Sequence, residues 1–302
     1  MKNSATLLSF LFLVTAAPGA DPAAKAPKLN PPAKIFKTAS PVVIDGQLDE
    51  PCWQQAISIP VDYVSGKIGV KSDSPCMTVK YTWDDHYLYI GYETFDSNLV
   101  ALGSDVWKGP PGRLRQGCEI YKAKSKVDVV EFFISFGDEH FFWELHHNAL
   151  NQFNDIWCTA LDPKWPISKT TMASYGIIFN REQWVADDGE YTVAMAVKLK
   201  PKADGQPSTV NDPTDVDTGY TAEIRLPLRS IGVPVSAATW IDKKPGPRVP
   251  GPWKMAGQTV SVLAVVQNGD LKDRYHDSSP TAKFDWFHKG EPSWPRYLFV
   301  AP

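Results

Sequence analysis

Glu131 and Glu144 are the residues whose type and spacing are best suited to chemistry. They lie in two alternating apolar runs, residues 128–136 and 139–146, which are joined by Gly137-Asp138. A two-residue loop at that point predicts a tight hairpin that places Glu131 directly opposite Glu144. Side chains opposite each other on paired strands have Cβ atoms about 5 Å apart, and like charges there are destabilising. The sequence therefore predicts that the repulsion between the two carboxylates is relieved by an arginine, a bound cation, a shared proton or solvent.

Three interpretations of the glutamate pair stay open at this point. The two carboxylates point into water, or they form a polar floor between Phe133 and Phe142 that faces a ligand, or they act as a glycosidase pair. Retaining glycosidases hold their two carboxyl groups about 5–5.5 Å apart, which suits the predicted spacing. Arg274 follows the penultimate strand. We expect it to pair with one of the glutamates, because an adjacent cation relieves their repulsion.

The other face of the predicted hairpin is apolar throughout. It consists of Val130, Phe132, Ile134, Phe136, Leu145, Trp143 and Phe141. A one-residue slip would mix the two faces, so this pattern supports the register and predicts a core position for Trp143. In the same register His146 and His147 point to opposite faces of the sheet, so we do not expect both to bind one metal ion.

Short β-type runs separated by turn residues continue along most of the chain. The predicted strands outside the hairpin are residues 79–83, 87–94, 191–200, 220–228, 260–266 and 297–300. Residues 49–56 are predicted to form one or two helical turns, with Asp49 as N-cap and Pro51 in the first turn. This pattern predicts an all-β fold, a single antiparallel β-sandwich of the jelly-roll kind with long loops.

The N-terminal residues 1–20 have the pattern of a secretory signal peptide. Lys2 precedes an apolar run, residues 7–14, which is too short to span a bilayer and is followed by small residues. We expect cleavage between Ala17 and Ala20, and a protein that is secreted or held in the periplasm or cell envelope. Residues 21–36 are rich in Pro, Ala and Lys and are predicted to be a linker, and residues 37–302 a single domain.

Charge and composition exclude several classes of partner. The 302 residues include 31 basic and 34 acidic side chains, a formal net charge of −3. Without a basic excess to neutralise phosphates, nucleic acid is not an expected partner. No segment is predicted to span a membrane.

Four cysteines remain after the expected cleavage point, at positions 52, 76, 118 and 158. An even number in an exported protein permits two disulfides with three connectivities. None lies in a CxxC pair, so a zinc site built on them is not expected. We expect Cys52, Cys76, Cys118 and Cys158 to be structural thiols or disulfide partners.

Several motifs together resemble carbohydrate-binding module family 9 and its relatives. Residues 43–53 resemble the IDGxLDExxW opening of that family, and residues 128–133 resemble its D-x-V-E-x-F strand. Residues 79–89 look like its second strand pair, residues 217–227 like its D-x-G-(W/Y)-T-x-E strand, and residues 287–299 like its closing strand. The motifs occur in the family's order along nearly the whole mature chain.

The resemblance implies a β-sandwich that binds a saccharide, often at a chain end. Its sugar-binding members hold the ring between two Trp faces while polar side chains satisfy the hydroxyls, as stacking and directed hydrogen bonds require. By position, Glu131 matches the ligand-contacting carboxylate and Trp286 the second stacking Trp. Glu144 stands where glucan-binding members have a basic residue. Gln267 and Asn268 match an amide pair near the end of the penultimate strand.

The first stacking Trp of the family has no direct counterpart, since Ser125 stands near its position. The preceding stretch, residues 107–126, contains Trp107 and Tyr121. Either ring is a candidate substitute if this stretch folds back over the site.

The resemblance also implies a possible calcium site. Several relatives carry a structural calcium, while sugar binding itself implies no cofactor. Asp212, Asp215 and Asp217 form an acidic loop whose oxygens suit calcium, and a solvated turn is the alternative.

A non-catalytic carbohydrate-binding protein is the favoured interpretation, with a glycan as ligand and a separate glycoside hydrolase as partner in polysaccharide breakdown. One alternative is a glycoside hydrolase that uses Glu131 and Glu144, one of them with a raised pKa. Another is a haem-binding redox module of the DOMON-like kind. Its candidate axial ligands are Met77, Met195, His86 and His146.

Overall fold

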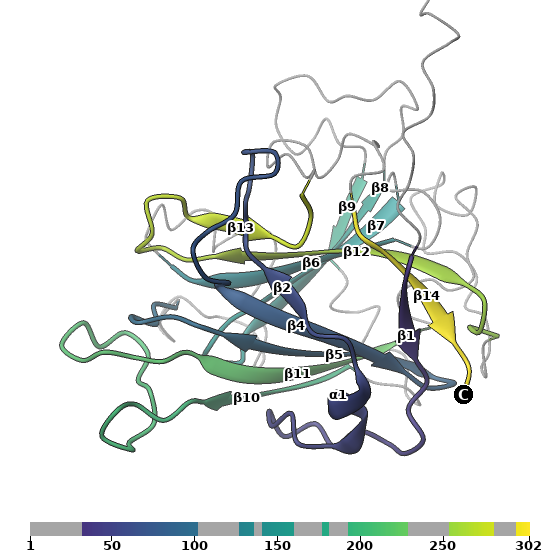
Figure 1. Cartoon of the computed structure of the whole chain (residues 1–302), viewed down its shortest axis with the longest axis horizontal. Helices are drawn as coiled ribbons and strands as arrows, with labels where there is room; N and C mark the ends of the chain where they lie inside the picture. The colour runs from purple at the N-terminus through teal and green to yellow at the C-terminus, as the bar shows by residue number, and fades with distance from the viewer. Residues whose placement is uncertain are drawn as a thin grey trace, which may run out of the picture.

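The computed structural model describes residues 32–101, 127–135, 141–159, 177–180, 193–228, 254–280 and 294–302. In this part of the chain two β-sheets lie one above the other, as Figure 1 shows. No helix in these ranges is long and apolar enough to cross a membrane. The predicted signal peptide, residues 1–20, lies outside the described residues.

The larger sheet has nine strands and contains the predicted glutamate hairpin. Its strand order is β1-β14-β12-β6-β7-β8-β9, while β13 pairs with both β12 and β3. The bounds are β1 Ala33–Phe36, β3 Tyr63–Val64, β6 Val129–Ser135, β7 Phe141–His147, β8 Phe153–Thr159, β9 Ile177–Asn180, β12 Thr259–Gln267, β13 Tyr275–Asp277 and β14 Arg296–Val300.

The smaller sheet has five strands in the order β10-β11-β5-β4-β2. Their bounds are β2 Ile59–Val61, β4 Met77–Trp83, β5 Tyr87–Thr94, β10 Ala194–Leu199 and β11 Tyr220–Pro227. Every named strand pair in both sheets is antiparallel except β1 with β14. The predicted all-β sandwich is therefore confirmed.

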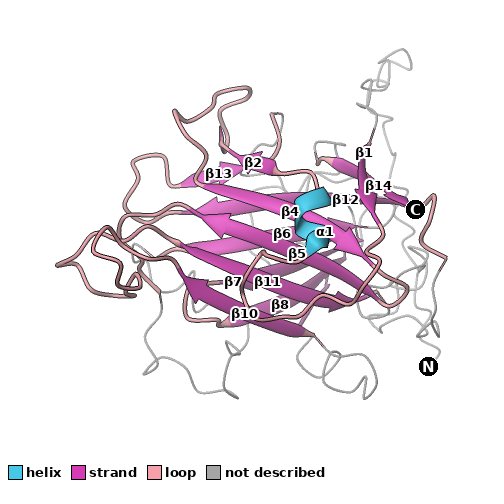
Figure 2. Ribbon diagram, turned by 60° about the horizontal axis from the view of Figure 1, so that its bottom comes forward, coloured by secondary structure: helices cyan, strands magenta, loops and turns pink. Residues whose placement is uncertain are grey.

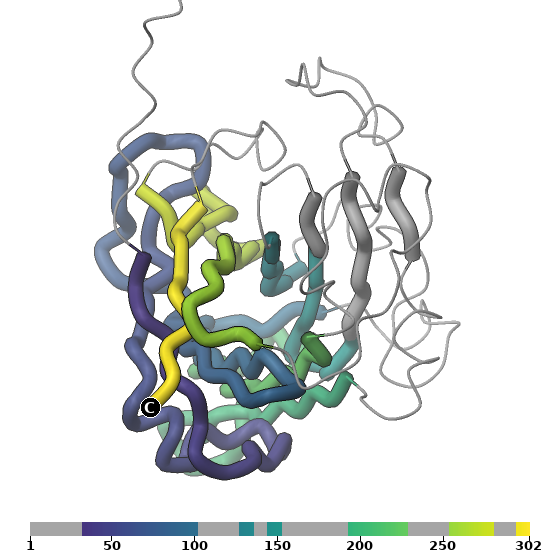
Figure 3. The backbone as a smooth tube through the Cα atoms, turned by 90° about the vertical axis from the view of Figure 1, so that its right-hand side faces the viewer, coloured from purple at the N-terminus to yellow at the C-terminus, as the bar shows by residue number. Residues whose placement is uncertain are grey.

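The folded domain begins earlier in the chain than the composition predicts. Residues 33–36 belong to the predicted linker, yet they form β1, which pairs with β14 near the C-terminus (Figure 3). Ile35 is buried in the core. The Pro- and Ala-rich composition hid a four-residue strand whose pairing partner is more than 260 positions away in the chain, roughly the domain's length.

The hydrophobic core lies between the two sheets because successive side chains along a strand point to opposite faces. Alternate residues of β6 (Val130, Phe132 and Ile134) pack in one buried cluster with residues of β4, β5 and β11. The intervening residues of β6, among them Glu131 and Phe133, consequently face away from the smaller sheet. This alternation decides which side chains form the candidate site.

A second, smaller apolar cluster covers the outer face of the five-stranded sheet. The helix α1 (Pro51–Gln55) lies across this face in Figure 2, and its Trp53 packs with Val42 and Tyr89. Glu50 rather than the predicted Asp49 is the N-cap, and its side chain makes no capping hydrogen bond. Because Pro51 has a fixed φ and no N–H, it starts the helix in place of a side-chain cap.

Glu223 of β11 ties the N-terminal motif to this sheet. Its carboxylate accepts hydrogen bonds from the Trp53 indole at 2.8 Å, from the Asp45 N–H at 2.9 Å and from the Gly46 N–H at 3.0 Å. Burial raises the pKa of Glu223 to about 7. Two motifs that lie far apart in the sequence thus meet at one buried carboxylate.

Cys52 and Cys76, the two cysteines whose side chains the structure describes, are free thiols. Cys52 is half-buried, and Cys76 is buried with its Sγ 3.4 Å from Nδ1 of His276. Neither takes part in a disulfide. The side chains of Cys118 and Cys158 lie outside the described part of the structure.

Gly91 of β5 gives a direct test of the packing under α1. A Cβ built at this position would lie 2.8 Å from Leu48 Cδ2 and 3.1 Å from the Trp53 ring. We therefore predict that Gly91→Ala lowers the free energy of unfolding by about 1–3 kcal/mol, the usual cost of overpacking. Urea denaturation measures the change. Adding Leu48→Ala should give a double variant whose loss is smaller than the sum of the two single losses, and strict additivity would contradict this packing.

Candidate functional site

The observed register of the glutamate hairpin differs from the predicted one by two residues. Glu131 lies opposite His146, and Glu144 lies opposite Phe133. The predicted Glu131–Glu144 pairing is therefore wrong. A shift of two positions keeps each residue on its predicted face, and it places an imidazole instead of a second carboxylate directly opposite Glu131.

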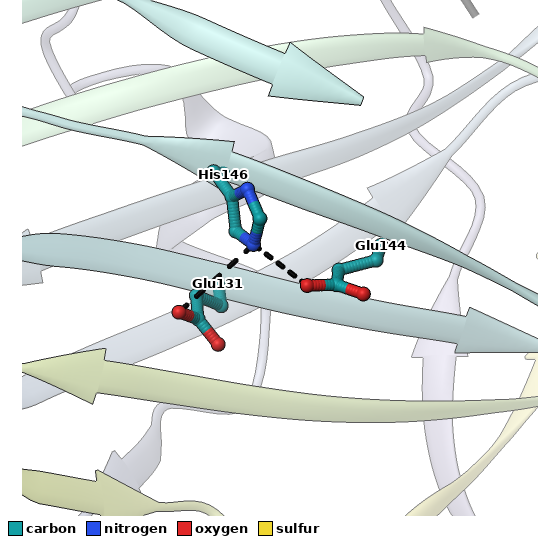
Figure 4. Close-up of side chains that lie close together, drawn as sticks. All are labelled: Glu131, Glu144 and His146. Atoms are coloured by element: carbon teal, nitrogen blue, oxygen red, sulfur yellow. Dashed lines mark hydrogen bonds and ion pairs between the residues drawn. The ribbon is translucent and has the colours of Figure 1, made fainter. Parts of the chain in front are cut away.

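Glu131, Glu144 and His146 form one compact cluster on the outer face of the larger sheet. His146 Nε2 is 2.8 Å from Glu144 Oε1 and 3.9 Å from Glu131 Oε1. Figure 4 shows the imidazole directed at both carboxylates. All three side chains are buried, with relative exposures of 1% for Glu131, 6% for Glu144 and 1% for His146. Burial excludes the interpretation of two glutamates splayed into water.

Aromatic side chains border this cluster. Phe133 packs against Trp294, with ring centroids 5.9 Å apart. Tyr275 on β13 is half-buried, and burial together with the charge of Glu131 raises the pKa of its hydroxyl. The outer face of the sheet thus combines a charged centre with apolar rings, as a polar floor for a ligand requires.

His147 serves a different purpose from its neighbour. Its Nδ1 is 2.6 Å from the Tyr92 hydroxyl and its Nε2 is 2.9 Å from Asn151 Oδ1. Burial lowers the pKa of His147 to about 4, so the ring is neutral. The prediction that the two histidines point to opposite faces is confirmed.

The remaining predicted ligand residues are placed apart from the cluster or outside the described part of the chain. Gln267 donates to the Val127 carbonyl at 3.0 Å, and Asn268 donates to Asp96 Oδ2 at 2.9 Å. Arg274 is exposed and forms no ion pair with either glutamate. Among the described residues, His146 is a basic group beside both glutamates, and the predicted register had moved it one pair away. Trp107, Tyr121 and Trp286 lie outside the described residues.

A group of aspartates joins the loops next to the site. Asp128, directly before β6, accepts from the Val100 N–H at 2.6 Å and the Gly269 N–H at 2.7 Å. Asp96 receives the Asn268 amide. Burial raises the pKa of Asp96 to about 6, and burial together with the charge of Asp96 raises that of Asp128 to about 8. These carboxyls hold the loops that end β5, precede β6 and follow β12.

In the acidic loop that was predicted to bind calcium, each carboxylate interacts with a different partner. Asp212 accepts from Thr214, Asp215 pairs with Lys202 at 2.5 Å, and Asp217 accepts from the N–H groups of Leu99 and Thr209. They do not form a group of converging ligand atoms. In the described ranges such a group is formed by Glu131, Glu144 and His146, whose ligand atoms all lie within 4.8 Å of one another.

The candidate haem ligands are not brought together. Met77 is buried in the core between the sheets and Met195 packs against that core, whereas His146 lies on the outer face of the larger sheet. His86 lies in the turn between β4 and β5. These positions do not form a Met–His pair on the two sides of one haem.

One segment of the chain matches a known protein family. Residues 44–139 match the family model described as carbohydrate family 9 binding domain-like. The resemblance inferred from the motifs is confirmed for that segment, which contains both the N-terminal motif anchored by Glu223 and the strand that carries Glu131. A search of curated proteins finds no match.

Solved structures resemble the chain at low sequence identity. A Bacteroides uniformis protein, provisionally described as carbohydrate-binding, is 13% identical with a TM-score of 0.50, and the match covers 89% of this chain and 97% of that one. A carbohydrate-binding module family 9 from Caldicellulosiruptor kristjanssonii, in complex with cellotriose, is 14% identical with a TM-score of 0.46, covering 89% and 94%. At this identity the first of these supports the fold alone.

The raised pKa of Asp128 predicts a specific dependence of stability on pH. Its pKa rises from 3.8 to about 8 on folding, so the folded state holds the proton more tightly than the unfolded state. The contribution of this group is fully present below about pH 4 and is lost as the pH rises through about 8. In urea denaturation at about pH 5 and pH 8, Asp128→Asn should therefore lose less stability between the two values than the wild type.

Wild type and variant are compared because His147 also makes stability depend on pH. Burial lowers the pKa of His147, so its contribution to the free energy of unfolding increases as the pH rises, opposite to that of Asp128. Its contribution is shared by both proteins and cancels in the difference. An identical pH dependence in wild type and Asp128→Asn would contradict the prediction.

Proposed function

We propose that this protein binds a carbohydrate through the outer face of its nine-stranded sheet, in the region of Glu131, Glu144 and Tyr275. The observation that carries the proposal is the place of Glu131. It belongs to the family 9-like segment, and its carboxylate lies in a buried polar cluster bordered by aromatic rings.

The chemistry of this face suits a sugar. Hydroxyl groups need directed hydrogen-bond partners, and ionised carboxylates are strong acceptors for them. The C–H faces of a pyranose pack well on aromatic rings. Glu131 and Glu144 provide acceptors, while Tyr275 offers a ring with a polar tip beside them. Trp286 remains the proposed stacking partner, and Trp107 or Tyr121 the proposed second ring.

The setting of this function is also part of the proposal. We propose an exported protein, cleaved between Ala17 and Ala20, that binds glycan without hydrolysing it and supports the work of a separate glycoside hydrolase. The charge balance and the signal-peptide pattern of residues 1–20 support export and a non-nucleic-acid ligand. A calcium requirement is tested by including and omitting the ion.

Isothermal titration of the mature protein with a panel of soluble glycans and short oligosaccharides tests the proposal. We expect saturable binding of one sugar class, and at least a tenfold loss of affinity in Glu131→Gln, since a hydrogen bond to a charged group contributes about 1.5–3 kcal/mol. Each titration is run with and without calcium.

Glu93→Gln is the matched control. Glu93 lies on the smaller sheet, where it pairs with Lys200 at 3.0 Å, so its replacement should leave sugar affinity unchanged. Trp286→Ala should weaken binding further. The proposal is overturned if no glycan binds, or if the Glu131 and Glu93 variants bind alike while both remain folded by circular dichroism.

The proximity of the two carboxylates favours one second candidate, a retaining glycoside hydrolase. Their nearest ligand atoms lie within 4.8 Å of one another, slightly closer than the about 5–5.5 Å that separates the two carboxyl groups in such enzymes. Release of reducing ends from a bound glycan, abolished in Glu144→Gln, would support this candidate. Binding without any release of reducing ends would support the non-catalytic function.

A further inference from the structure

We infer that Glu131, Glu144 and His146 form a binding site for a divalent transition-metal ion of the zinc class. The site uses side chains from two adjacent strands, β6 and β7, and it does not rest on the proposed carbohydrate function. Cysteine spacing gave no indication of it, because none of its ligands is a thiol.

The geometry brings three suitable ligand atoms to one point. His146 Nε2 is 2.8 Å from Glu144 Oε1 and 3.9 Å from Glu131 Oε1. Zinc holds imidazole nitrogen and carboxylate oxygen at about 2.0–2.2 Å, which separates neighbouring ligand atoms by about 3–4 Å. The observed distances are close to this range, so small side-chain adjustments would admit an ion between the three groups (Figure 4).

The strand register pre-organises these ligands. Glu131 and His146 are Cα partners across β6 and β7, and Glu144 lies two residues before His146 on the same face. Strands of a packed sheet hold their side chains more rigidly than loops do, which favours a defined coordination geometry. The three residues are at least nine-tenths buried.

Charge favours a cation at this place. Both carboxylates bind a cation in their deprotonated form, in which they carry two negative charges. Buried charges in proteins are paired or coordinate metals, because transfer from water is otherwise costly. A divalent ion bound by neutral His146 and both carboxylates would neutralise the three groups together.

The ligand types select the class of ion. Calcium and magnesium prefer oxygen ligands alone, whereas an imidazole with carboxylates suits zinc and neighbouring first-row metals. Three protein ligands leave at least one coordination position for water or a ligand oxygen. The site therefore differs in chemistry from the oxygen-only acidic loop of Asp212, Asp215 and Asp217.

The test is a calorimetric titration of untagged, chelator-treated mature protein with zinc chloride, in the absence of any glycan. We expect one ion per chain, and at least a tenfold weaker affinity in His146→Ala and in Glu144→Gln. Circular dichroism establishes that each variant is folded. Using two variants keeps the test decisive if one of them does not fold.

Two controls exclude other sites. His86→Ala removes a histidine in the turn between β4 and β5, and Cys76→Ala removes the described thiol that contacts an imidazole, with Sγ 3.4 Å from His276 Nδ1. Both variants should bind zinc like the wild type. The inference is overturned if the protein binds no zinc at micromolar concentrations, or if the control and site variants lose affinity equally.

A separate glycan titration in the presence of chelator keeps the two proposals distinguishable. Glycan binding without zinc binding would overturn the metal site alone. Zinc binding without glycan binding would leave the metal site standing and remove the carbohydrate function.

Discussion

The alternation of side chains along β6 is the constraint on which both the core and the candidate site depend. Val130, Phe132 and Ile134 point into the core between the sheets, so Glu131 and Phe133 must point to the opposite face. A slip by one residue would bury the carboxylate among apolar side chains, whereas a slip by two preserves both faces. The packing of the core therefore fixes where the polar cluster lies, and pairing with β7 brings His146 beside it.

Glu223 plays the corresponding structural part on the other sheet. Its buried carboxylate binds the Trp53 indole and the N–H groups of Asp45 and Gly46, so it joins the N-terminal motif to β11. Leaving such a group without partners in the interior would be costly, so the N-terminal motif stabilises the buried carboxylate of β11. One sheet thus uses a buried glutamate to hold the fold, and the other presents its glutamates as a candidate site.

Hydrophobic alternation and turn residues were sufficient to predict most strands and the faces of the glutamate hairpin. They did not determine its register, because pairings two residues apart give the same separation of apolar and polar faces. The opposition of Glu131 to His146 was the available signal, since it relieves the repulsion that the predicted pairing created. β1 was hidden because its partner β14 is at the far end of the chain. The predicted rings at positions 107, 121 and 286 lie outside the described residues and stay predictions.

A backbone amide chemical-shift map, recorded while a binding glycan is added to isotopically labelled protein, locates the face that binds the sugar. If the outer face of the larger sheet binds the sugar, the largest shifts should lie in β6, β7 and β13, around Glu131, His146 and Tyr275. Shifts confined to β10 and β11 of the smaller sheet and to α1 on its outer face would show that the sugar binds elsewhere.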